Sequence, residues 1–151
     1  MQENQTNSRV RLINLAPWPV YFPRINTLGD VSIQQNGSYM IDREELLAQC
    51  YNNNRLIMGT DGRGAHATVI IMDEAVKAEF DIPENQEVLT DEVLDKLFAY
   101  KRQADFEKAI TAKIVRDYEA HRVISYISRK KVNDFNKVRF VEGLTGLRAE
   151  A

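Results

Sequence analysis

The fold is decided by residues 84–142, ENQEVLTDEVLDKLFAYKRQADFEKAITAKIVRDYEAHRVISYISRKKVNDFNKVRFVE, which contain neither glycine nor proline. By contrast, all four prolines and five of the seven glycines lie in residues 1–83. Glycine and proline mark turns, so this contrast predicts short β-strands first and helices afterwards. We therefore expect an α+β protein with a small antiparallel sheet or barrel and one helix on its N-terminal side. A C-terminal helical hairpin or arm should follow.

Within the stretch without glycine and proline, Thr90 is predicted to cap the first helix. Its apolar stripe comprises Val93, Leu94, Leu97, Phe98 and Ala104. A second helix carries apolar or aromatic residues at spacings of three and four, namely Phe106, Ile110, Ile114, Tyr118 and His121. The two could form a hairpin or one bent helix. A third helix should begin at Asp134, carry Phe135, Val138 and Val141, and end at Gly143 as its C-terminal cap.

Outside this stretch the pattern is of strands and turns. Strands are expected at 9–15, 20–22, 31–33, 39–41, 55–58 and 67–72. Asn36-Gly37 and Asp61-Gly62 are predicted to be hairpin turns, with Gly64 as a bulge. Asp42 should open a helix with Glu45 completing a capping box. The expected organisation is a disordered tail at 1–7, a β module at 8–73, an acidic linker at 74–89 and a helical region at 90–151.

The overall composition sets limits on function. The 151 residues carry a net charge of −2, which argues against a surface built wholly to grip nucleic acid. The longest purely apolar run is residues 69–72, far short of the roughly 20 residues that span a membrane. The polar N-terminus lacks the features of a signal peptide. Cys50 is the only cysteine, so an internal disulfide is excluded.

Charge is segregated within the helical half. Residues 74–98 hold eight acids and two bases, whereas residues 101–139 hold eleven bases and five acids. Opposite blocks of this size can pair as antiparallel helices within one chain or between neighbouring subunits. Because exposed ion pairs contribute only about 0–1 kcal/mol each, we expect the pattern to set register and partner choice.

The candidate chemical sites are weak in sequence. The cluster from Gly59 to His66 has glycine spacing G-x-x-G-x-G and precedes a strand, unlike a dinucleotide or phosphate loop. His66 with Asp61 and Asp73 matches no established metal-ligand spacing. A small hydrolase around Asp61 and His66 is the enzymatic alternative. The sequence therefore predicts a protein without catalytic, cofactor or metal residues.

Two groups of residues suggest interaction surfaces. The nucleic-acid candidates are the cations Arg129, Lys130, Lys131, Lys137 and Arg139, interleaved with aromatic rings in a helix-turn-helix outline. The simpler interpretation of this group is a solvated helix end, because cations favour helix C-termini. The candidates for protein contact are Trp18, Arg63, Phe98, Phe106 and Tyr118. Trp18 could equally plug the core.

Two stretches carry a resemblance. Residues 37–67, GSYMIDREELLAQCYNNNRLIMGTDGRGAHA, and residues 134–147, DFNKVRFVEGLTGL, resemble small proteins encoded by tailed bacteriophages and prophages. The resemblance implies an accessory or virion component, located in the virion or the host cytoplasm. It covers under a third of the chain and assigns no residue a role.

These observations favour a non-enzymatic assembly protein of a bacteriophage virion. Such a protein could decorate the capsid, complete the head or associate with the connector. Its partners would be further copies of itself, or capsid or portal-type proteins, and no cofactor is expected. The alternative is a nucleic-acid-binding accessory protein that uses the basic C-terminal helices.

Overall fold

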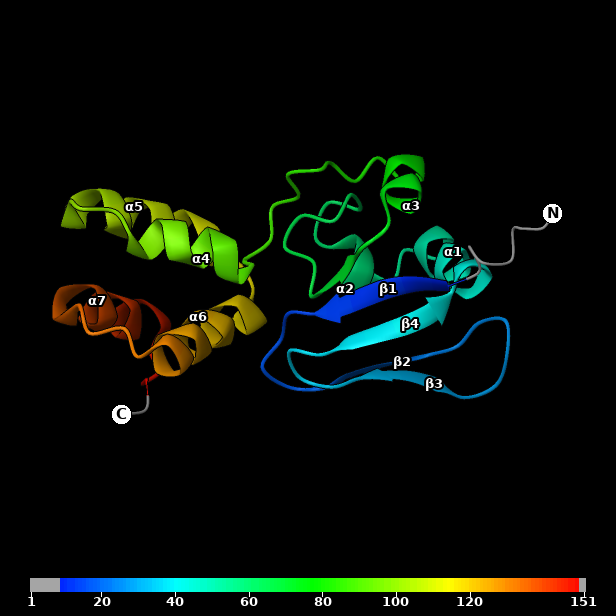
Figure 1. Cartoon of the computed structure of the whole chain (residues 1–151), viewed down its shortest axis with the longest axis horizontal. Coiled ribbons are helices and arrows are strands. Elements are labelled where there is room, and N and C mark those ends of the chain that lie inside the picture. The colour runs from blue at the N-terminus through cyan, green and yellow to red at the C-terminus, as the bar shows by residue number, and fades with distance from the viewer. Residues whose placement is uncertain (1–8, 150–151) are drawn as a thin grey trace. The chain divides into compact units, whose positions relative to one another are not determined.

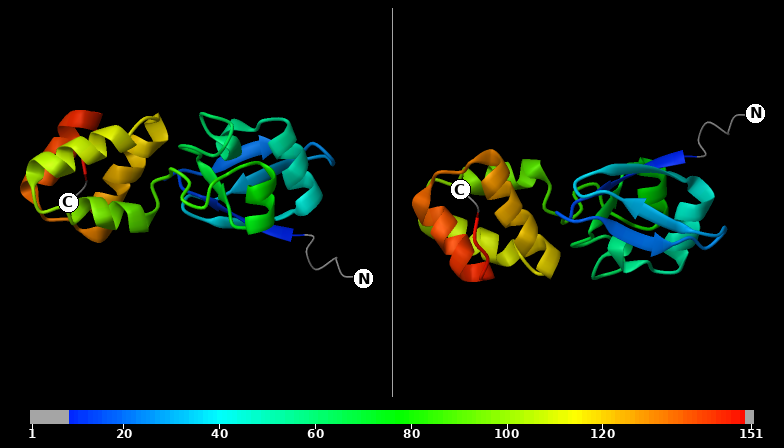
Figure 2. Two further views of the ribbon diagram at one scale, coloured as in Figure 1. Left: turned by 90° about the horizontal axis from the view of Figure 1, so that it is seen from above. Right: turned by 90° about the horizontal axis from the view of Figure 1, so that it is seen from below.

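The computed structural model describes residues 9–149, so the tail expected at residues 1–7 lies outside the described residues. The chain is mixed α+β and divides into two compact units, Met1–Val88 and Leu89–Ala151. We call them the N-terminal unit and the helical unit (Figures 1 and 2). Their formal charges differ in sign. The N-terminal unit has seven bases and twelve acids, and the helical unit has thirteen bases and ten acids.

The N-terminal unit contains two antiparallel sheets. Strands β1 (Arg9–Asn14), β4 (Ser38–Asp42) and β5 (Val69–Ile71) form the larger sheet in the order β4-β1-β5. Strands β2 (Val20–Pro23) and β3 (Asp30–Ile33) form a separate ribbon. Within the described residues the two sheets do not close into a barrel, so that part of the expectation is wrong.

Three helices complete this unit: α1 (Arg43–Tyr51), α2 (Arg55–Met58) and α3 (Glu74–Glu79). Helix α1 contacts β1 and β4, and α2 contacts β5. Helices α1 and α2 therefore cover one face of the larger sheet. Every second residue of its strands points to this face and is buried or half-buried there. The buried apolar side chains include Val10, Leu12, Ile41, Leu46, Ile57, Val69 and Ile71.

Asn14 is the buried polar side chain that joins the two sheets. Its amide nitrogen lies 2.9 Å from the Trp18 carbonyl, 3.1 Å from that of Gln34 and 3.2 Å from that of Ile33. Its oxygen accepts from the Ala16 amide at 2.9 Å. One side chain thus bonds to backbone groups from the end of β3 and from the β1–β2 loop, as buried polar groups in proteins generally require.

Three local predictions for this unit are wrong. The Asn36-Gly37 turn does not join a paired hairpin, because β3 pairs with β2 whereas β4 pairs with β1. Residues 55–58 form a helix and not a strand, because the Asn54 side chain caps the amide of Leu56. Asp42 does precede α1, but no side-chain hydrogen bond completes the expected capping box.

Glu45 has a different task from the one that the sequence suggests. Its carboxylate is buried and accepts from the Ile25 amide at 2.7 Å and the Asn26 amide at 3.0 Å. It therefore fixes the β2–β3 loop against α1. Burial raises the pKa of Glu45, but the two backbone hydrogen bonds, the Gln49 hydrogen bond and the charge of Arg24 together leave the pKa below its ordinary value.

Residues 74–89 are more ordered than a linker. They contain α3, whose first turn is capped by Asp73 through a 3.0 Å bond from the Val76 amide. Val76, Ile82 and Val88 are buried. The boundary between the two compact units falls after Val88, at the end of this segment.

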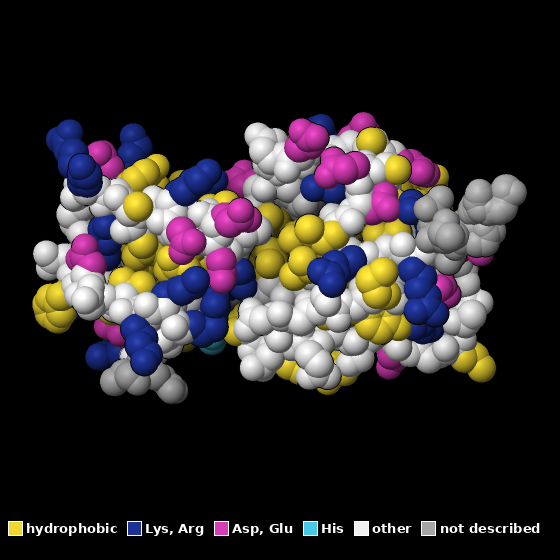
Figure 3. Space-filling model, in the orientation of Figure 1, with side chains coloured by type: hydrophobic (Ala, Val, Ile, Leu, Met, Phe, Trp, Pro, Cys, Tyr) yellow, Lys and Arg dark blue, Asp and Glu magenta, His cyan; other side chains and the backbone are white. Residues whose placement is uncertain are grey.

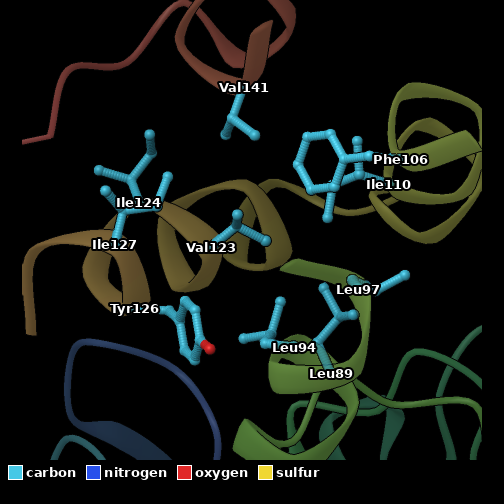
Figure 4. Close-up of a cluster of buried hydrophobic side chains, with 10 residues drawn as sticks. All are labelled: Leu89, Leu94, Leu97, Phe106, Ile110, Val123, Ile124, Tyr126, Ile127 and Val141. Atoms are coloured by element: carbon cyan, nitrogen blue, oxygen red, sulfur yellow. The ribbon is translucent and has the colours of Figure 1, made fainter. Parts of the chain in front are cut away.

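The helical unit consists of α4 (Asp91–Phe98), α5 (Gln103–Lys113), α6 (Asp117–Lys130) and α7 (Phe135–Thr145). Thr90 caps α4 and Asp134 caps α7, as predicted. All four helices pack around one apolar core (Figure 4). Its members are Leu89, Leu94, Leu97, Phe106, Ile110, Val123, Ile124, Tyr126, Ile127 and Val141. A four-helix unit with its own core replaces the expected hairpin or arm.

Two helix boundaries also differ from the prediction. The expected second helix is two helices, because the backbone becomes extended at Ile114 and the Glu119 carboxylate accepts from the amides of Val115 and Arg116. Helix α7 passes through Gly143 and ends at Gly146, which adopts the left-handed conformation with φ 76°. The prediction of Gly143 as the cap is therefore wrong, because Gly146 is the glycine that adopts the left-handed conformation.

Candidate functional site

The loop between α2 and β5 holds the residues considered for catalysis and metal binding. The Asp61 carboxylate accepts from the amides of Arg63 at 2.7 Å and Ala65 at 3.1 Å, so it closes its own turn. This loop follows a helix, so Asp61-Gly62 is not the predicted hairpin turn and Gly64 is not a strand bulge. Burial raises the pKa of Asp61, but these amide bonds outweigh it and lower the pKa.

The other two residues of that candidate site serve separate structural tasks. His66 is buried, with its Nε2 3.7 Å from the Glu87 carboxylate. Asp73 caps α3 and pairs with Arg43 at 2.8 Å. Among the residues that the structure describes, no cluster of three His, Cys, Asp or Glu side chains could hold a metal ion.

The five residues suggested for protein contact fall into two groups. Phe106 and Tyr118 are buried, so they belong to the interior of the helical unit. Phe98 is half-buried and stacks on Tyr126 with ring centroids 5.3 Å apart. Trp18 is 36% exposed, and Arg63 is exposed with its Nε donating to the Asp81 carbonyl. Of these five residues, Trp18 and Arg63 are the two that the structure places in the exposed class.

The five basic residues suggested for nucleic acid are also divided by the structure. Lys137 is buried, and its ammonium donates to the carbonyls of Phe98 at 2.7 Å and Tyr100 at 2.5 Å. It also lies 5.4 Å from the centre of the Phe106 ring. The cation therefore satisfies carbonyls at the C-terminal end of α4, where the helix dipole favours positive charge. Its position one turn before Val141 was the signal in the sequence that it faces the core.

Arg129 is engaged with α4. Its guanidinium lies 3.0 Å from the Asp91 carboxylate, which also pairs with the buried Arg122 at 3.1 Å. The Arg129 hydrogen bond is the main reason that the pKa of Asp91 is lowered. The acidic and basic blocks of the sequence thus pair within one chain here. Lys130, Lys131 and Arg139 are exposed.

The larger sheet has an outward apolar surface that sequence analysis missed. We call it the open sheet face, formed by Arg11, Ile13, Met40, Ile70 and Met72. Arg11 lies opposite Met40 and Ile13 lies opposite Ile70 in the strand register. The amide of Met72 donates to the Arg11 carbonyl at 2.9 Å, which extends the ladder by one residue.

The two methionines of this face are strongly exposed. Met40 is 49% exposed and Met72 is 52% exposed, while Ile13 and Ile70 are half-buried. Figure 3 shows hydrophobic side chains grouped over β1 and β4, with basic side chains among them. The alternation of buried and exposed residues along β1 and β4 indicates this face, because the residues between the buried ones point to the opposite side of the sheet.

Comparison with models of known protein families, with curated proteins and with solved structures finds no match for the chain. Every helix in the described range 9–149 is too short or too polar to cross a membrane.

Proposed function

We propose that the protein is a non-enzymatic assembly component of a tailed-bacteriophage virion that acts through protein–protein contacts. Its place would be at the capsid surface, in head completion or beside the connector. Its partners would be further copies of itself or capsid and portal-type proteins. The proposal joins the resemblance of residues 37–67 and 134–147 to phage-encoded proteins with one structural feature, the open sheet face.

The open sheet face carries the proposal because four of its five side chains are apolar and two of them are exposed methionines. Methionine has an unbranched, polarizable side chain that adapts to partner surfaces, so it recurs at contact sites. The exposed Met40 and Met72 lie on either side of Arg11 on the sheet. Aliphatic and thioether groups in this arrangement suit burial against another protein, with Arg11 available to pair with a carboxylate or a backbone carbonyl.

The test is sedimentation velocity of the purified protein, alone and with virion shells, from low to moderate salt. We expect self-association or co-sedimentation with the shells. Replacing Met40 and Met72 together by serine should weaken it on the order of tenfold or more, because two partly exposed apolar side chains no longer become buried.

The matched control replaces Val115 and Leu144 by serine. These two apolar side chains of the helical unit are 60% and 41% exposed, so a general loss of surface hydrophobicity would affect both variants alike. A wild-type monomer that binds no shell at any of these salt concentrations contradicts the proposal.

A further inference from the structure

A basic surface with two exposed aromatic rings lies at one end of the helical unit. We call it the basic end surface, formed by Tyr100, Lys101, Arg102, Phe135, Arg139 and Arg148. It combines the loop between α4 and α5 with the outer side of α7 and the chain that follows it. Tyr100 is 42% exposed and Phe135 is 66% exposed.

Two hydrogen bonds hold the two halves of this surface together. The buried Lys137 of α7 donates to the Tyr100 carbonyl at 2.5 Å. Gln103, at the start of α5, donates to the Asn136 carbonyl at 3.2 Å. The α4–α5 loop is thereby fixed against the first turn of α7, which brings the loop's cations to the same end of the unit as Phe135.

The surface contains two open grooves, and their lining residues together carry a positive net charge. One is lined by Tyr100, Lys101, Arg102, Asp105, Lys108, Ala109 and Ala112, and the other by Phe135, Arg139, Glu142, Gly143 and Arg148. Together they hold five basic residues and two acidic ones. Asp105 lies 3.9 Å from Arg102 in an exposed pair, and Glu142 accepts from the Ala149 amide. In the described chain, Lys101, Arg139 and Arg148 have no carboxylate within ion-pair distance.

Phe135 is exposed although the apolar spacing of α7 predicts it on the core side. The guanidinium of Arg139 lies 5.3 Å from the centre of its ring. An exposed ring beside a guanidinium offers a flat surface on which an unpaired base can stack, while neighbouring cations contact phosphates. Tyr100 supplies a second ring in the neighbouring groove.

We infer that the basic end surface binds single-stranded nucleic acid without sequence preference. This goes beyond the proposed assembly function and does not depend on it. It also revises the sequence-based candidate set. Arg139 stays, and Lys101, Arg102 and Arg148 are added. Arg129 and Lys137 leave the set because they bind Asp91 and the end of α4, and Lys130 and Lys131 leave it because they lie at the end of α6, outside the two grooves. Single strands are favoured over duplexes because stacking requires bases with an accessible ring face.

The experiment is fluorescence anisotropy of a labelled oligothymidylate of about 15 nucleotides, with an oligouridylate and a DNA duplex as further probes. Affinity of the wild type should fall linearly on a log–log plot between about 50 and 200 mM salt. Both single strands should bind more tightly than the duplex, and a duplex that binds as tightly as the single strands would overturn the inference.

Replacing Tyr100 or Phe135 by alanine should weaken single-strand binding about tenfold each and leave the salt slope unchanged. Replacing Lys101 and Arg139 by glutamine should reduce the slope by about 1.4, since each phosphate contact on a single strand contributes about 0.7. Circular dichroism confirms that each variant is folded.

The matched comparison is the glutamate pair K101E/R139E against K130E/K131E, which carry the same change in charge. The first pair should lose at least tenfold more affinity. Equal or greater loss with K130E/K131E would place binding at the end of α6 and overturn the inference. So would unchanged binding after both aromatic replacements, or absence of binding at low salt. Equal competition by polyglutamate would assign the surface to acidic proteins and also overturn it.

Discussion

The two units differ in the buried charges that satisfy their irregular backbone. The N-terminal unit uses an anion at one loop, whereas the helical unit uses two cations and, at the turn between α5 and α6, the Glu119 carboxylate. In the N-terminal unit the Glu45 carboxylate accepts from two amides of the β2–β3 loop. In the helical unit the Lys137 ammonium donates to two carbonyls at the end of α4, and the buried Arg122 donates to the Leu89 carbonyl. The β2–β3 loop presents unpaired amides and needs an acceptor, whereas the C-terminal end of a helix presents unpaired carbonyls and needs donors. Charged residues are usually expected at the surface, but in both units these charged residues are buried and stabilise the backbone.

The largest expected effect on stability comes from removing a side chain of the apolar core of the helical unit. Phe106 is fully buried at the centre of the helical unit and contacts the rings of Phe98 and Phe140. Replacing it by alanine should lower the free energy of unfolding of the helical unit by about 3–5 kcal/mol. Urea denaturation followed by circular dichroism measures this. Phe135→Ala is the matched control, because its ring is exposed, and it should change stability by less than about 0.5 kcal/mol.

The buried cation of the helical unit comes next. Lys137→Met keeps much of the side-chain volume but leaves the carbonyls of Phe98 and Tyr100 without their donor. We expect a loss of about 2 kcal/mol in the unfolding free energy, because buried unsatisfied acceptors are costly. Lys131→Met, at an exposed position, should have almost no effect. Equal stability of the two variants would show that Lys137 is not an internal support.

The buried anion of the N-terminal unit should make the stability of that unit depend on pH. Because the folded pKa of Glu45 is lowered, its stabilisation is full above the unfolded value of about 4.3 and is lost as pH falls through the folded pKa. Glu45→Gln should therefore cost about 1–2 kcal/mol near neutral pH and less in acid.

The control for that experiment is Glu44→Gln, one residue away and exposed. It should leave the stability of the N-terminal unit and its pH dependence unchanged. If Glu45→Gln matches Glu44→Gln across the acid range, the carboxylate does not hold the β2–β3 loop.

The smallest effects separate the two glycines of α7. Gly143 lies inside the helix with open space around it, so Gly143→Ala should stabilise the helical unit by about 0.5–1 kcal/mol. Gly146 has φ 76°, so Gly146→Ala should destabilise it by about 1 kcal/mol. Thermal denaturation of both variants measures the difference. The reverse order would restore Gly143 as the cap.

The sequence predicts features that depend on neighbouring residues. The caps Thr90 and Asp134, the apolar stripe from Leu94 to Leu97 and most strands appear where spacing and turn residues indicate. Features that depend on distant partners were not predictable. The Asn36-Gly37 turn indicates a hairpin locally, but the two strands that it joins pair with different partners. Strand β3 pairs with β2 and strand β4 pairs with β1. The burial of Lys137 requires the carbonyls of α4, which are 37 to 39 residues away along the chain.

The same reasoning applies to the surfaces. Phe106 and Tyr118 were suggested for contact because large aromatic residues are common at interfaces, but those residues also fill cores. The open sheet face becomes visible only when β4, β1 and β5 are placed side by side, since Met40 and Met72 are 32 positions apart in the chain. The basic end surface likewise requires two segments that meet through Lys137 and Gln103.

The most direct test of the proposed assembly role is the protein composition of tailed-phage particles purified from cells that carry the gene for this chain. Mass spectrometry should detect the wild-type protein in the particles. The M40S/M72S variant should be strongly depleted from them, while the V115S/L144S variant should be retained. Absence of the wild-type protein from the particles, or equal retention of both variants, would contradict assembly through the open sheet face.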